Sequence, residues 1–322
     1  MRPGGSRALS FLAQAGRHGR VLLVAGLLAG IALPSLAARM APFLPVLIAS
    51  LLFLAVLRIG PARMVGTFGD AKRTLRDVLI LQLVVPLCVC ALLAGFGLLG
   101  TVPGMAVALL FAAAPLAGSP NLTLMVGFDP DHAVRLVILG TALIPLTAIP
   151  VFWALPGLTG GAEVLGSALR LLVVIGLAAI AAVLFRRHVL PDPDRSTLDA
   201  IDGLSAIAMA VVVVALMSAI GPALSSAPGA LAAWMALAFA ANLGAQGLAA
   251  MTLRLRGAGV TLVPTSIVAG NRNVALFLVS LPPEQAAQLL TFIGCYQVPM
   301  YLTPLLMPRF YRRIAGPEGR AP

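Results

Sequence analysis

Ten apolar runs, each roughly 17–24 residues long and almost free of charge, fill most of this 322-residue sequence. A helix needs about 20 apolar residues to cross the hydrocarbon core of a bilayer, so runs of this length predict membrane-spanning helices. Only 10% of the residues are charged and 60% are hydrophobic, whereas soluble domains carry about 25% charged residues, which excludes a water-soluble enzyme. The predicted spans, one to ten, cover residues 21–38, 41–57, 78–99, 104–127, 132–155, 164–185, 200–221, 229–251, 259–281 and 286–307.

The positive charges predict the orientation of these spans. The chain has 22 Lys and Arg against 11 Asp and Glu. If the N-terminus is cytoplasmic, every Lys and Arg falls in a cytoplasmic segment except Arg39 in an outside loop and Arg170 and Arg272 within spans. Such asymmetry is typical of cytoplasmic loops. It predicts a multi-pass protein with both termini cytoplasmic, and it accounts for the net charge of +11 without a nucleic-acid partner.

Two further readings concern the source and the first run. Lys72 is the only lysine, and this preference for arginine is typical of a GC-rich bacterial genome. We therefore expect the protein to lie in the plasma membrane of a bacterium, its inner membrane. A cleaved signal peptide ending near 35–37 is the alternative for the first run, which is longer than the usual signal-peptide core.

Spans four and nine are interrupted near their middles. Span four contains Pro115–Asn121, and span nine contains Pro264–Ser266 followed by Gly270–Asn273. Proline removes a backbone donor and glycine weakens a helix. The freed backbone groups then need partners from protein or from a water-lined cavity. Because an apolar half-helix follows each interruption, at 122–126 and 274–281, we expect two broken helices.

Both interruptions occupy the fourth span of a set of five. Because five is odd, the second set enters the membrane from the opposite side, as in inverted-repeat secondary transporters, where broken helices meet around the substrate. The predicted fold is an all-α membrane protein with ten transmembrane helices in two inverted five-helix repeats, residues 1–157 and 158–322, with broken crossing helices four and nine. A structural kink is the alternative for either break.

Short motifs at the breaks resemble the bile acid:sodium symporter family and its bacterial relatives. The resemblance implies a core of spans three to five and eight to ten, in which spans four and nine cross, and a panel of spans one, two, six and seven that moves against it. It also implies transport by alternating access. The matching residues are Ser119-Pro120-Asn121, Gly270-Asn271-Arg272-Asn273-Val274-Ala275-Leu276, and Phe292, Gln297, Met300, Tyr301 and Pro304.

The sequence departs from the sodium site that the resemblance implies. In sodium-coupled members, side chains of spans four and five and a glutamate of span nine bind sodium. Asn121 and Asn273 stand at the family's asparagine positions. However, Arg272 replaces a glutamine, Val268 replaces the glutamate, and Pro120 replaces a serine. A fixed cation about 5 Å from sodium costs about 3 kcal/mol at an effective dielectric of 20, so the usual site is not expected and the coupling ion, sodium or a proton, stays open.

Arg272 is expected deep in span nine. An arginine in the membrane is costly and usually faces a cavity, and its planar fork suits carboxylates. We therefore predict that it draws a small organic anion to the crossing. The alternative is a structural arginine bonded to carbonyls of a broken helix. The predicted substrate-binding residues are Ser119, Asn121, Thr123, Asn271, Arg272, Asn273 and Gln297.

These patterns predict a secondary transporter, not an enzyme, whose partners are an organic anion and the lipid bilayer. The transporter alternatives are a true sodium symporter with an atypical site and an auxin-efflux-like carrier; a membrane sensor or enzyme without transport is the alternative of another class. No phosphate-binding loop, catalytic triad or metal-ligand spacing is present, so no cofactor or metal is expected. Asn242 and Gln246 share one helix face and either line the cavity or join helices. The histidines, His132 among them, fall in predicted cytoplasmic segments, and the oligomeric state stays open.

Overall fold

A computed structural model describes residues 3–59, 71–156 and 161–315; Arg2, Arg63 and Arg320 of the charge pattern lie outside this range. Every element named over the described residues is a helix. This is the architecture of a multi-pass helical membrane protein. Six helical stretches are long and apolar enough to cross a membrane, namely Pro34–Arg58, Ala71–Gly95, Gly161–His188, Arg195–Ser226, Pro228–Leu255 and Pro283–Leu306.

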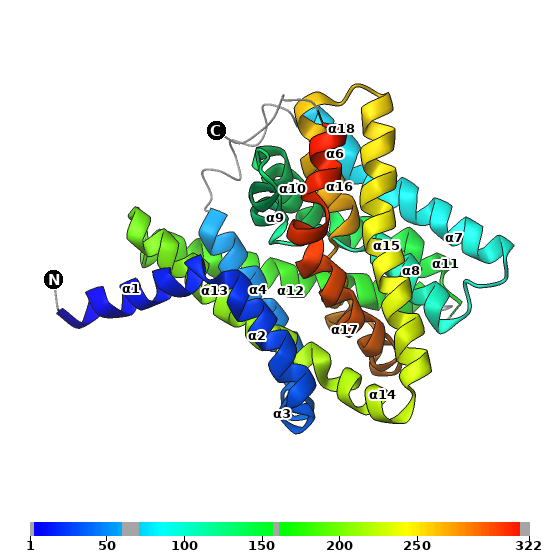
Figure 1. Cartoon of the computed structure of the whole chain (residues 1–322), viewed down its shortest axis with the longest axis horizontal. Coiled ribbons are helices and arrows are strands. Elements are labelled where there is room, and N and C mark those ends of the chain that lie inside the picture. The colour runs from blue at the N-terminus through cyan, green and yellow to red at the C-terminus, as the bar shows by residue number, and fades with distance from the viewer. Residues whose placement is uncertain (1–2, 60–70, 157–160, 316–322) are drawn as a thin grey trace. The chain divides into compact units, whose positions relative to one another are not determined.

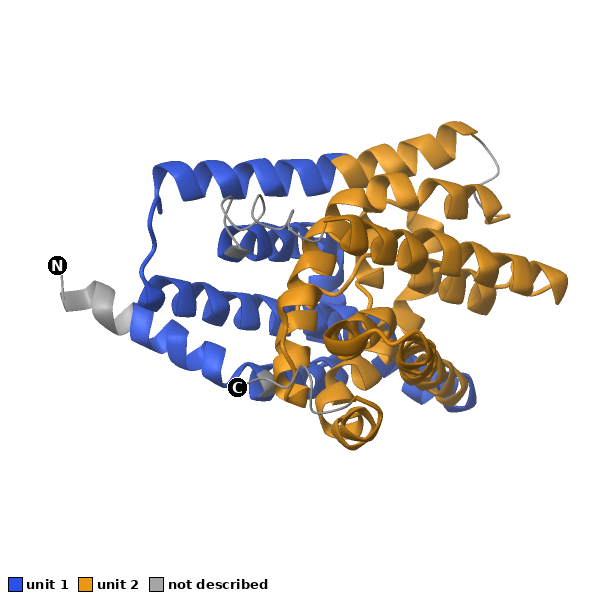
Figure 2. Cartoon of the chain, turned by 90° about the horizontal axis from the view of Figure 1, so that it is seen from above, with its two compact units in different colours: residues 1–66, 173–231 blue, residues 67–172, 232–322 orange. Residues whose placement is uncertain are grey.

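The helices form two compact units, and each unit takes helices from both halves of the sequence. Unit one comprises residues 1–66 and 173–231, and unit two comprises residues 67–172 and 232–322 (Figure 2). The long helix α12 (Gly161–His188) contributes residues to both units.

Unit one is organised along α13 (Arg195–Leu216), which contacts α1 (Pro3–Arg17), α2 (Gly19–Ala32) and α4 (Leu44–Ile59) (Figure 1). Glycines allow this close packing: a Cβ on Gly26 would lie 2.7 Å from the carbonyl oxygen of Ala210. Arg58 of α4 and Asp202 of α13 form an ion pair of 2.6 Å. The remaining elements are α3 (Pro34–Met40), η1 (Ala41–Phe43), η4 (Met217–Ala219) and α14 (Ile220–Ser226).

The N-terminal part of unit one differs from the prediction in two ways. The sequence reading left α1 out. It also placed the end of the first run at residue 38, whereas α2 ends at Ala32. The reason is Pro34, because the residue before a proline is disfavoured in the helical region, and Leu33 is non-helical there, with φ −120° and ψ 64°. Pro34 begins α3, so Arg39 lies in a helix and not in a loop.

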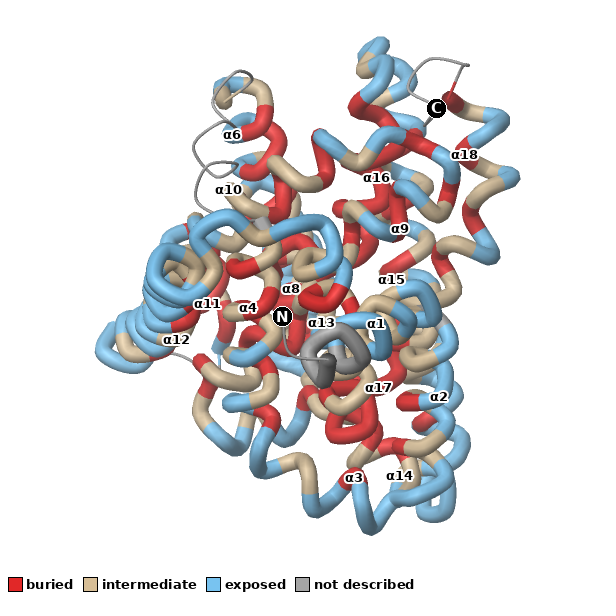
Figure 3. Tube along the Cα trace, turned by 90° about the vertical axis from the view of Figure 1, so that its left-hand side faces the viewer, coloured by how far each residue is buried: buried red, intermediate tan, exposed pale blue. Residues whose placement is uncertain are grey.

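Unit two contains two helices that end in non-helical segments. The first is α8, followed by non-helical residues 113–118, and the second is α16, followed by non-helical residues 271–273. All nine residues of α16 are buried (Figure 3). Its elements are α6 (Ala71–Leu79), η3 (Ile80–Val84), α7 (Val85–Gly95), α8 (Val102–Ala112), α9 (Ser119–Val126), α10 (Asp131–Thr147), α11 (Ile149–Ala154), most of α15 (Pro228–Leu255), η5 (Gly259–Thr261), α16 (Leu262–Gly270), η6 (Val274–Val279), α17 (Pro283–Leu306) and α18 (Pro308–Ile314).

Candidate functional site

The two non-helical segments of unit two pair with each other. The backbone N–H of Leu116 donates to the carbonyl of Asn271 at 3.0 Å, and the N–H of Asn273 donates to the carbonyl of Ala114 at 2.8 Å. Pro115 and Arg272 therefore face each other as an antiparallel bridge. The backbone groups that the broken helices release thus satisfy each other.

This pairing falls at Ala114–Leu116, at the start of the interruption predicted over Pro115–Asn121, and it does not include the predicted binding residues Ser119 and Asn121. Those two residues already belong to the first turn of α9. Proline is tolerated in the first turn of a helix, so Pro120 starts α9 where it was read as part of the break.

A buried amide cluster holds the end of α16. The Asn242 side-chain amide of α15 donates to the carbonyl of Gly270 at 2.5 Å and to Oδ1 of Asn271 at 3.3 Å. Gln246, one turn further along α15, donates to Oδ1 of Asn242 at 2.8 Å. Asn242, Gln246 and Asn271 are fully buried. These amides therefore join α15 to the broken helix, which is one of the two roles predicted for them.

Three hydroxyl groups near the C-terminus complete this cluster. Tyr296 of α17 donates to the carbonyl of Gly270, and Thr303 donates to Oδ1 of Asn271 at 3.3 Å. Tyr311 of α18 donates to Oε1 of Gln246 at 2.9 Å. Burial raises the pKa of the Tyr311 phenol, so this hydroxyl keeps its proton and remains a donor. Sequence reasoning did not identify these three residues.

Arg272 reaches from the crossing to the middle of the α6–η3–α7 helix. Its side chain is only 2% exposed, and Nη2 donates to the carbonyl of Leu81 at 2.5 Å. That carbonyl is available because η3 is a π-turn, in which the N–H of Val85 bonds to Ile80 five residues back. The next residue in this pattern is Pro86, which has no N–H to give to Leu81.

The rest of the Arg272 guanidinium lacks partners. Nε and Nη1 are buried and have no hydrogen-bond partner among the described residues. The hydroxyls of Thr265 and Ser119 are also buried and also have no hydrogen-bond partner among the described residues. A buried charge without a counter-charge is costly. This arginine is therefore a candidate position for binding an anion or ordered water.

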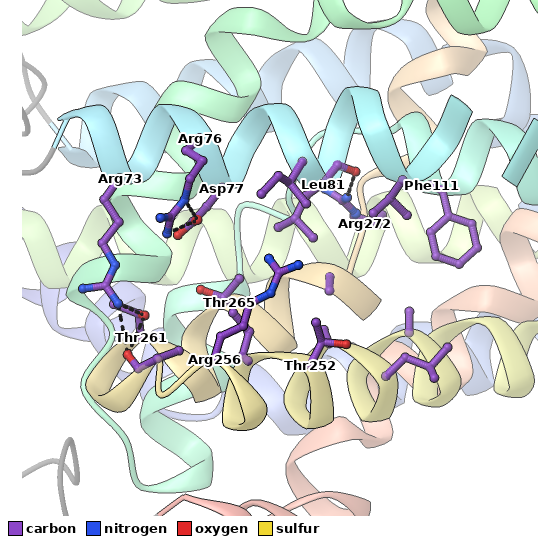
Figure 4. A pocket seen from close by; sticks show the side chains of 18 of the residues that line it. Arg73, Arg76, Asp77, Leu81, Phe111, Thr252, Arg256, Thr261, Thr265 and Arg272 are labelled. Carbon is purple, nitrogen blue, oxygen red and sulfur yellow. Dashed lines mark hydrogen bonds and ion pairs between the residues drawn. The ribbon is translucent and has the colours of Figure 1, made fainter. Parts of the chain in front are cut away.

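A cavity of about 890 Å³ within unit two reaches Arg272. It lies between α6–η3–α7 on one side and α15 and α16 on the other (Figure 4). Lys72, Arg73, Arg76 and Arg256 line one end of it, while Val85, Val89, Phe111 and Leu248 line the other. Asp77 is the only acidic residue among the lining residues, so the cavity is positively charged.

Asp77 and His132 form a buried pair beside this cavity. Nε2 of His132, on α10, donates to Oδ2 of Asp77 at 3.2 Å, and both side chains are buried. Arg76 also donates to Asp77, at 3.0 and 3.1 Å. The short link before α10 brings His132 against α6. Its assignment to a cytoplasmic segment stays a prediction.

The seven predicted site residues fall into three groups. Asn271, Arg272 and Asn273 form one strand of the crossing, and Asn273 is half-buried. Thr123 and Gln297 are buried, but each donates to a carbonyl of its own helix, Ser119 and Ile293 respectively. Asn121 is exposed on α9, and Ser119 is buried at its start.

Neither a known family model nor a curated protein matches this chain. Over the described ranges, no group of three or more His, Cys, Asp or Glu side chains could hold a metal ion.

Proposed function

We propose that this chain is a secondary active transporter that moves a small organic anion by alternating access and binds it at the crossing of the two broken helices. We further propose ten crossings in two inverted repeats, in a bacterial inner membrane, with both termini cytoplasmic. In the sequence alone, the resemblance to the bile acid:sodium symporter family supports this function.

The observation that carries the proposal is Arg272 at the crossing. It is a buried cation with two unpartnered nitrogen atoms and no carboxylate in contact among the described residues. An anion that binds there gains charge-assisted hydrogen bonds, which are shorter and stronger than those between neutral groups. Anion binding therefore offsets the free-energy cost of burying the unpaired charge of Arg272.

The division into two compact units adds support. Unit one has the helices of predicted spans one, two and seven and most of span six, and unit two has the rest. Alternating access requires two bodies that move against each other around a bound substrate. Arg272 and both broken helices belong to one of them, unit two.

The direct test measures the flux of radiolabelled short organic anions into proteoliposomes, with sodium and proton gradients imposed separately. A transporter shows saturable uptake of at least one anion, driven by one of the two gradients. Absence of any flux across the panel, with correctly folded protein, contradicts the proposal and favours a sensor or an enzyme. Sodium-driven uptake at fixed pH identifies a sodium symporter with an atypical site.

Two substitutions test the role of Arg272. Arg272→Gln keeps a donor for the Leu81 carbonyl but removes the charge, and Arg272→Lys keeps the charge. We expect Arg272→Gln to weaken the apparent affinity for the anion about tenfold or more, and Arg272→Lys to retain more of it. Arg312→Gln on the exposed face of α18 is the matched control. Unchanged affinity in a folded Arg272→Gln protein contradicts anion binding by this residue.

A further inference from the structure

The cavity of unit two has two centres of positive charge, and we infer that it takes an elongated dianion: one anionic group at Arg272 and the second at the basic end formed by Lys72, Arg73 and Arg256. This inference rests on the proposed function and specifies the class of anion. It follows from which charges are compensated, how far apart they are, and what lies between them.

The basic end retains uncompensated charge. Arg76 is paired with Asp77, so these two largely neutralise each other. Arg73 donates to neutral acceptors only, the carbonyl of Ala258 at 3.0 Å and the hydroxyl of Thr261 at 2.8 Å. Lys72 and Arg256 have no ion-pair partner within the described part of the chain.

Arg256 extends from the end of α15 into the cavity, on the side of Thr265 (Figure 4). Arg256 is exposed, whereas Arg272 is buried. A ligand with a single charge can neutralise only one of these two centres. A ligand with an anionic group at each end neutralises both.

Two helices give the separation of the centres. Arg73 and Leu81, the partner of Arg272, are eight residues apart on α6 and η3, which corresponds to about 12 Å at a rise of 1.5 Å per residue. Thr261, the partner of Arg73, precedes Asn271 by ten residues along η5 and α16, or about 15 Å by the same rise. Both estimates exceed the size of one carboxylate, so a single small anion cannot bridge the two centres.

Apart from the Arg76–Asp77 ion pair, the walls between the two centres are apolar or carry a hydroxyl group. They suit an aliphatic or ring spacer, which gains from burial of its methylene groups. Charge at both ends and an apolar middle together define the class, an α,ω-dianion with an extended hydrophobic spacer. The lining residues in this stretch are Ile80, Ala249, Thr252, Thr265 and Ala269.

The test compares two ligand series on the purified full-length protein in lipid nanodiscs. Isothermal titration calorimetry measures the affinity for unbranched α,ω-dicarboxylates from butanedioate to dodecanedioate and for monocarboxylates of the same carbon number. We expect the ratio of dicarboxylate to monocarboxylate affinity to rise with length and reach about tenfold or more once the spacer bridges both centres. The shortest dicarboxylates should show no such preference.

Substitution at the basic end should remove the preference. Arg256 is exposed and lies outside the two paired segments of the crossing, so the Arg256→Gln variant is expected to fold. It should lower the affinity for long dicarboxylates more than that for monocarboxylates, and the ratio should fall several-fold. Arg312→Gln, which removes one exposed charge outside the cavity, should leave the ratio unchanged.

The outcomes separate this inference from the proposed function. If monocarboxylates bind and are transported no less well than dicarboxylates of every length, the dianion inference is overturned and the proposal of anion transport stands. An undiminished ratio in Arg256→Gln also overturns it. Absence of binding and flux for both series contradicts the dianion and the transport proposal together.

Discussion

Gly270 and Asn242 lie so close that no side chain fits between them. A Cβ on Gly270 would stand 2.3 Å from the backbone carbonyl oxygen of Asn242 and 2.4 Å from Cγ of Gln246. This contact brings the last residue of α16 against α15, and it allows the Asn242 amide to reach the Gly270 carbonyl. The position of the crossing therefore depends on the absence of one methyl group.

Gly270→Ala should destabilise the protein by about 1–3 kcal/mol, because it overpacks a site bounded by backbone. Gly247→Ala on α15 is the matched control, since its Cβ would meet nothing within 4 Å, and alanine is favoured over glycine in a helix by about 1 kcal/mol. Chemical denaturation in micelles measures both. Equal stability of the two variants would show that α15 and α16 are not in contact at this point.

The bond from Arg272 to Leu81 predicts an interaction with Pro86. Arg272→Leu leaves the buried Leu81 carbonyl without a donor, at a cost of about 1–3 kcal/mol. Pro86→Ala supplies an N–H five residues after Leu81, in the register of the π-turn. The destabilising effect of Arg272→Leu should therefore be about 1 kcal/mol smaller in the Pro86→Ala background. A double-mutant cycle from four denaturation curves tests this, and strict additivity would contradict it.

The Asp77–His132 pair should stabilise the fold because each buried side chain supplies a hydrogen-bond partner for the other. Asp77→Leu leaves the buried Nε2 of His132 without an acceptor and should cost about 1–3 kcal/mol. Adding His132→Leu should recover part of that loss, because both polar groups are then gone. Asp192→Leu, at an exposed position with no ion-pair partner among the described residues, is the control and should change stability by less than about 0.5 kcal/mol. A double variant less stable than Asp77→Leu alone would argue against this account.

Unit one offers an independent prediction at Gly203. A Cβ there would lie 1.7 Å from the carbonyl oxygen of Leu12, so Gly203→Ala should push α1 away from α13. We expect a loss of about 1–3 kcal/mol and faster alkylation of a cysteine placed at Ala13. Gly176→Ala, whose Cβ would meet nothing within 4 Å, should change neither measurement.

Local sequence rules located the two breaks in part. Proline and glycine act on the backbone within one turn, and Pro115 follows the end of α8 while Gly270 is the last residue of α16. Pro264–Ser266, predicted as part of the second interruption, lies inside α16. The same rules could not tell which residues of the two segments pair. Pro120 is compatible with both a break and a first helical turn, and only the packing of α9 decides between them.

Residues whose role depends on distant partners were missed. Tyr296, Thr303 and Tyr311 are separated from Asn242 and Gln246 by 50 or more positions, and nothing in their own neighbourhood indicates a shared cluster. Asp77 and His132 each stand near charged residues at a span end, where a solvent-facing position is the usual expectation. Their pairing arises from the approach of α6 and α10.

The backbone pairing at the crossing has a mechanical consequence. Because Ala114–Leu116 and Asn271–Asn273 share two peptide hydrogen bonds, neither broken helix can be displaced without its counterpart unless both bonds are lost where water is scarce. Arg272 is therefore held in register with Pro115, and a movement that keeps both bonds carries the two half-helix ends together.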